Sequence, residues 1–226
     1  MSSLLTILSF SQNPSCLVVK NVKKSLFSNR EAKHGEAFVL NIGLKSKIKM
    51  TSIPKTIDEA FMDYRTTYIA RSPDLSNMSY DDELHLITAE DGLFCLSNPP
   101  VELEEYARIE DFWNTSSQKY LWVVAKTDVR LALEKGENRK TLDRGFLSHT
   151  NLTGGDEAHS GGEAWFLDCR KVVINGGSSR YKPRNETELD EIVTALSESG
   201  YMAAHLGWDE GSGRASRIKR GELRWK

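Results

Sequence analysis

The side chains best suited to chemistry gather in the glycine-rich segment 144–184, which contains His149, Glu163, Arg180 and Tyr181. A histidine or a glutamate can move a proton, and an arginine can grip a phosphate through paired N–H groups. We expect these four residues to be catalytic. Four further polar side chains of the same segment are expected to bind the substrate, namely Arg144, Asn175, Ser179 and Arg184.

Two reactions fit this set of side chains. In a metal-independent ribonuclease, a base takes the 2′-hydroxyl proton, an arginine binds the phosphate and an acid protonates the leaving oxygen. In a nucleotide-transfer enzyme, Arg144 or Arg180 would hold a pyrophosphate, and Glu163 would stabilise a positively charged sugar in the transition state. The first hypothesis is therefore an enzyme that acts on RNA or a nucleotide.

Each of these residues also has a structural interpretation. His149 could be a hydrogen-bonded histidine in a short strand, and Glu163 could pair with a nearby Lys or Arg. Arg180 and Tyr181 could form a packed corner before Pro183. Asn175 and its two following glycines are typical of a hairpin turn. Three double glycines within 24 residues indicate tight turns or close approach of the backbone to its neighbours.

Three strings in this region resemble those of a little-characterised bacterial or phage protein group: HTNLTGG at 149–155, GGEAWF at 161–166 and INGGSSRY at 174–181. The resemblance covers about residues 140–220. It brings no established activity and so assigns no catalytic residue. It implies a bacterial or phage source, which argues against an organelle targeting segment.

Familiar cofactor motifs are absent from the sequence. There is no P-loop, no dinucleotide-binding glycine pattern and no serine-hydrolase elbow. His149 and His159 do not match a standard zinc spacing, and three scattered cysteines do not suggest a disulfide framework. We therefore expect neither a cofactor nor a metal.

The net charge of −2 conceals two unlike parts. Residues 1–49 carry a net charge of +6 and the rest of the chain carries −8. The first part is serine-rich and poor in acids, as targeting segments are. It could also be a docked strand or helix, or a basic arm. We expect a poorly structured basic extension over 1–49, with a single domain over 50–226 that starts near Met50.

Residues 214–226 form a second basic stretch, which could dock on the acidic domain or bind a polyanion. No apolar run approaches the ~18 residues of a membrane span, so we expect no membrane partner and a cytoplasmic location.

Local patterns predict an α+β fold, with a mostly antiparallel sheet and about four helices. A capping box at Thr56 begins a helix over 56–70, and apolar spacing predicts another over 186–199. Shorter helices are expected at 79–91 and 128–135, and 101–112 is ambiguous. Strands are expected at 93–96, 120–125, 145–150, 163–167, 171–175 and 201–206, with a last strand or tail over 217–225.

Two functional hypotheses remain nearly equal, beside a purely structural domain. The alternative to the enzyme is a binding or inhibitor module that engages a partner protein through its acidic surface, because complementary charge steers association. The enzyme hypothesis requires His149, Glu163 and Arg180 to meet on one concave face. The binding hypothesis requires no such convergence.

Overall fold

The computed structural model describes residues 53–100, 119–135, 142, 145–217 and 222–226. Outside these residues lie the extension expected over 1–49, the ambiguous stretch 101–112 and Arg144, one of the expected substrate-binding residues. The unit described below belongs to Pro54–Lys226.

A six-stranded sheet forms the centre of this unit, in the order β1-β3-β2-β4-β5-β6. Neighbouring strands are antiparallel except for the β5–β6 pair, which is parallel. The expected α+β class with a largely antiparallel sheet is therefore confirmed. The strands are β1 (Phe94–Cys95), β2 (Tyr120–Val124), β3 (Val129–Leu133), β4 (Ser160–Asp168), β5 (Lys171–Asn175) and β6 (Met202–His205), and a separate hairpin joins β7 (Trp208–Asp209) to β8 (Arg214–Ala215).

Three α-helices occur among the described residues, rather than about four: α1 (Ile57–Ala60), α2 (Met62–Thr67) and α3 (Glu186–Glu198). The capping box at Thr56 is present, because the Thr56 side chain accepts the Glu59 N–H and the Glu59 carboxylate accepts the Thr56 N–H. The Asn185 side chain caps α3 by accepting the Glu188 N–H. The helices expected at 56–70 and 186–199 are thus confirmed, although Phe61 divides the first into two.

Three expectations were wrong. Residues 129–133 form strand β3 instead of a helix. The alternate residues Val129 and Leu131 pack into the core while the backbone of this strand pairs with β1 and β2. Residues 79–91 contain two 3₁₀ helices, η1 (Asp81–Leu84) and η2 (Ala89–Asp91), instead of one α-helix. The strand expected at 145–150 is replaced by the 3₁₀ helix η4 (His149–Leu152), where three interior hydrogen bonds displace strand pairing.

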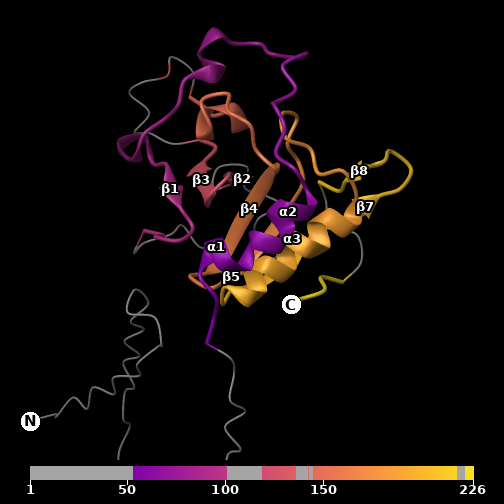
Figure 1. Cartoon of the computed structure of the whole chain (residues 1–226). Helices are drawn as coiled ribbons and strands as arrows, with labels where there is room; N and C mark the ends of the chain where they lie inside the picture. The colour runs from indigo at the N-terminus through magenta and orange to yellow at the C-terminus, as the bar shows by residue number, and fades with distance from the viewer. Residues whose placement is uncertain (1–52, 101–118, 136–141, 143–144, 218–221) are drawn as a thin grey trace, which may run out of the picture. The chain divides into compact units, whose positions relative to one another are not determined.

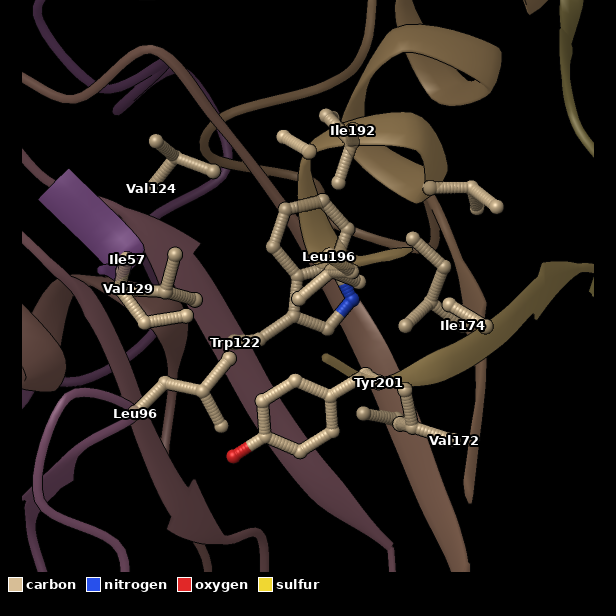
Figure 2. Packing of buried hydrophobic residues seen from close by; sticks show 14 of the residues in the cluster. Ile57, Leu96, Trp122, Val124, Val129, Val172, Ile174, Ile192, Leu196 and Tyr201 are labelled. Atoms are coloured by element: carbon tan, nitrogen blue, oxygen red, sulfur yellow. The ribbon is translucent and has the colours of Figure 1, made fainter. Parts of the chain in front are cut away.

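The main core lies between the sheet and the three helices, which cross one face of it (Figure 1). Trp122 of β2 occupies its centre, with Ile192 and Leu196 of α3 above it and Val172 and Ile174 of β5 beside it (Figure 2). This packing fixes α3 against the sheet, because burying each large apolar side chain contributes about 1.5–3 kcal/mol.

The opposite face of the sheet has two smaller apolar clusters. One packs Leu121 and Val123 of β2 against Leu152 and Tyr181. The other places Leu223 and Trp225 of the C-terminal tail on Trp165, Val173 and Leu206. The Lys226 N–H also donates to the Ala203 carbonyl of the edge strand β6 (2.9 Å). The described part of the basic tail is thus docked on its own sheet. No helix among the described residues has the length and apolar character needed to cross a membrane.

Candidate functional site

Glu163 lies on β4 in a half-buried polar cluster on the face of the sheet away from the helices. Its carboxylate accepts a hydrogen bond from Lys119 Nζ (2.6 Å) and another from Asn175 Nδ2 (2.8 Å). Lys119 also pairs with Glu134 (3.1 Å). Burial alone would lower the pKa of Lys119, but the charges of Glu163 and Glu134 raise it, so this ammonium group stays charged.

Asn175 joins this cluster to the following turn. Its Oδ1 accepts the backbone N–H groups of Glu163 (3.0 Å) and Gly177 (2.8 Å). The side chain is fully buried, and all of these bonds stay within the protein. Asn175 therefore holds the end of β5 against β4. The hairpin turn expected at Asn175 and its two glycines was wrong, because β4 and β5 are joined by a turn at 169–170 and the chain continues from Asn175 towards α3.

His149 begins η4 and is buried. Its Nε2 donates a hydrogen bond to the carbonyl oxygen of Gly162 (2.8 Å), so this nitrogen carries the ring proton. Burial lowers the pKa of His149 from its ordinary value of 6.5 to about 4. The ring is therefore neutral at pH 7, and its hydrogen bond connects η4 to the glycine-rich start of β4.

Arg180 is buried and bonds to a distant part of the chain. Its Nε and Nη2 donate to Oε2 of the buried Glu83 (3.1 and 2.5 Å). Its Nη1 and Nη2 donate to the backbone carbonyls of Asp74 (2.9 Å) and Asn77 (3.0 Å). Four of the five N–H donors of the guanidinium group are thus used inside the protein, and the buried group is not presented to a phosphate.

The remaining candidates are dispersed. Tyr181 is fully buried and its hydroxyl bonds to the Asp156 carbonyl (2.7 Å) and to Thr153 Oγ1 (2.7 Å). Arg184 is partly exposed and pairs with Glu188 (2.8 Å) at the start of α3. Ser179 is exposed. Glu163 and Asn175 thus share one hydrogen-bond cluster, whereas His149, Arg180, Tyr181 and Arg184 each bond elsewhere. This arrangement does not favour the nuclease or nucleotide-transfer hypothesis.

Three buried side chains, Arg180, Asn151 and Glu83, fix the backbone of the irregular segment 74–91. Arg180 bonds to carbonyls at Asp74 and Asn77, and Asn151 Nδ2 donates to the carbonyls of Asp82 (2.8 Å) and His85 (2.9 Å). Glu83, bound to Arg180, accepts the Ser79 N–H (3.0 Å). The segment has few regular hydrogen bonds of its own, so interior side chains determine its shape.

The fixed segment carries exposed apolar side chains, a feature that the sequence patterns did not indicate. Each is between 39% and 46% exposed, although every one is large enough to belong in a core. We call this group the 74–91 surface. It comprises Leu75, Met78, Tyr80, Leu84 and Leu86.

The double glycine at 154–155 lies directly beneath the 74–91 surface. Gly154 and Gly155 have φ values of +68° and +84°, which L side chains rarely adopt. A Cβ atom on Gly154 would lie 3.1 Å from Leu86 Cβ, and one on Gly155 would lie 3.0 Å from Leu84 Cδ2. These glycines therefore let the segment approach η4 closely.

Acidic residues flank the apolar side chains. Between Ser72 and Pro100 the sequence has no Lys or Arg. Of its acids, Glu83 pairs with Arg180 inside the protein and the exposed Asp74 pairs with Lys182 (3.5 Å), whereas Asp81 and Glu90 are exposed. The lack of basic residues over this stretch was the one signal in the sequence that could have pointed to it.

Comparisons with known proteins give no family assignment. No protein-family model matches the chain, and neither a curated protein nor a solved structure shows significant similarity to it. Among the described residues, no group of three or more His, Cys, Asp or Glu side chains is arranged to hold a metal ion. The site must therefore be interpreted from its own geometry.

Proposed function

We propose that this protein is a binding module that engages a partner protein through the acidic, apolar 74–91 surface. The observation that carries the proposal is the exposure of five large apolar side chains on a single segment of fixed backbone. Single exposed apolar residues are common on protein surfaces, but several on one short segment that also carries exposed acids are typical of an interaction site.

The fixed backbone makes binding more favourable. Ordering a flexible loop on binding costs conformational entropy, which subtracts from the affinity. Here the cost is met during folding, because Arg180 and Asn151 already hold the carbonyls of Asp74, Asn77, Asp82 and His85. The surface is thus ready to receive a partner with little rearrangement.

Site-specific photo-cross-linking tests the proposal. A photoreactive amino acid would replace Leu84 or Leu86 in the full chain, made in the cells that produce it. Met62 and Met202 supply matched control positions, since they are apolar and even more exposed, at 57% and 51%, but lie away from the segment. We expect a discrete protein adduct from Leu84 and Leu86 and none from the two control positions.

Competition makes the test specific. Unlabelled wild-type chain should abolish the adduct, and a Leu84→Ser/Leu86→Ser chain should not. Equal adducts from all four positions, or none at the two leucines, would overturn the proposal.

A further inference from the structure

We infer that the partner docks a cationic amphipathic α-helix on the 74–91 surface. This inference rests on the proposed function and specifies the chemistry of the partner. It combines two independent features of the surface: where its backbone hydrogen bonds go, and which charges surround its apolar side chains.

The backbone of the segment favours recognition through side chains. The carbonyls of Asp74, Asn77, Asp82 and His85 accept bonds from Arg180 and Asn151. The N–H groups of Asp74 and Ile87 donate to the carbonyls of Arg180 and Asn151. With these groups turned inward, the segment does not offer the ladder of free N–H and C=O groups that an added β-strand needs.

A helix suits such a surface because it satisfies its own backbone hydrogen bonds and presents only side chains. Its apolar face, repeating at three- and four-residue intervals, would cover Leu84, Leu86 and their neighbours. An extended peptide would instead leave its own polar backbone groups facing apolar side chains, which costs free energy.

The charges of the surface select a basic helix. Asp81 and Glu90 are exposed on the same segment, which contains no lysine or arginine between Ser72 and Pro100. Lys182 pairs with Asp74 of this segment. Like charges across an interface are repelled, whereas opposite charges steer the approach. Lysine or arginine residues flanking the apolar face of the helix would complement these carboxylates.

Defined peptides test the inference on the full chain. The probe is a fluorescent helical peptide of about 18 residues, with leucine on one face and lysine on the flanks. The first comparison peptide has glutamate in place of lysine, and the second keeps the composition but has central prolines that prevent a helix. Affinities would be measured by fluorescence anisotropy at about 50 mM and about 300 mM salt, where charge screening differs strongly.

We expect the lysine peptide to bind at least about tenfold more tightly than either comparison peptide, and to weaken at the higher salt. Asp81→Lys/Glu90→Lys should remove most of this preference. The matched charge reversal Asp63→Lys/Glu210→Lys, at exposed acids outside the segment, should leave it in place.

The outcomes separate the two claims. Equal binding of the lysine and glutamate peptides, or of the helical and proline peptides, would overturn the inference. If the comparison peptides bound as tightly as the lysine peptide, but Leu84→Ser/Leu86→Ser abolished the binding of all of them, the surface itself would still stand as a binding site. Binding that is unaffected by Leu84→Ser/Leu86→Ser would instead contradict the proposed function.

Discussion

Buried polar side chains in this protein bond to the backbone of other segments. His149 bonds to Gly162, Asn151 to the carbonyls of Asp82 and His85, and Arg180 to those of Asp74 and Asn77. A buried polar group without a partner costs about 1–3 kcal/mol, and an unpaired buried charge costs more. These residues therefore act as internal connections, and their removal should change stability as well as local shape.

Replacing Arg180 with alanine should lower the free energy of unfolding by about 3–5 kcal/mol, because the buried charge of Glu83 would lose its ion-pair partner. Urea denaturation followed by tryptophan fluorescence measures the change. Lys182→Ala is the control, since the exposed Lys182 makes only a 3.5 Å ion pair with Asp74 and should matter by less than about 1 kcal/mol. Similar losses for both variants would show that Arg180 does not anchor the segment. The double variant Arg180→Met/Glu83→Leu should recover part of the loss.

The histidine at 149 should make stability depend on pH. Its pKa is about 4 in the folded protein and 6.5 ordinarily, so protons bind more readily to the unfolded chain. The contribution of the neutral His149 to the free energy of unfolding is fully present above pH 6.5. It is lost as the pH falls from 6.5 to 4, which lowers the free energy of unfolding by about 3 kcal/mol in total. Denaturation of wild type and His149→Gln at several pH values measures this contribution. A variant with the same pH slope as wild type over this range would contradict it.

Among the secondary-structure elements, those with clear local patterns were predicted. Periodic apolar spacing predicted the helix over 186–199, and an unbroken apolar run predicted the strand at 120–125. The strands at 163–167, 171–175 and 201–206 were also expected, and the structure contains all of these elements. Residues 129–133 were mistaken for a helix because Leu, Ala, Glu and Lys favour helices, yet tertiary pairing decides the outcome. The segment 74–91 was expected to contain one helix over 79–91, but bonds from distant side chains hold it as two 3₁₀ helices within irregular backbone. Sequence alone also could not distinguish a reactive histidine or arginine from one that bonds to its own backbone.

Of the two glycines in β4, Gly162 has the closer neighbours. A Cβ atom there would lie 1.9 Å from the Asn175 carbonyl oxygen and 2.9 Å from the Trp122 ring. Trp122 Nε1 donates to that same carbonyl (3.2 Å). The Asn175 carbonyl and the Trp122 ring therefore leave no room for a side chain at position 162. Gly162→Ala should cost about 3 kcal/mol or more.

The control for this substitution is Gly145→Ala, because nothing lies within 4 Å of a Cβ at that position. It should change the free energy of unfolding by less than about 1 kcal/mol. Thermal denaturation of the two variants makes the comparison. Equal midpoints would contradict the close packing of β4, β5 and Trp122.

At the scale of the whole molecule, charge is segregated along the chain. The total of −2 combines a basic first segment with an acidic remainder, and within that remainder residues 72–100 contain acids but no lysine or arginine. The described basic tail instead docks on the sheet, where the ammonium of Lys171 lies 4.7 Å from the centre of the Trp225 ring. Of the nine large apolar side chains that are exposed among the described residues, five belong to the 74–91 segment, which also carries exposed acids.

Methionine oxidation tests the central claim most directly, because the described unit has exposed methionines on and off the surface. Met78 is 42% exposed on it, and Met62 and Met202 are 57% and 51% exposed elsewhere. Peptide mass spectrometry would follow oxidation of each in the full chain, with and without saturating lysine–leucine helical peptide. Burial by the peptide should slow oxidation of Met78 several-fold and leave the other two unchanged. Equal rates at Met78 with and without the peptide, or equal protection of all three, would contradict binding at the 74–91 surface.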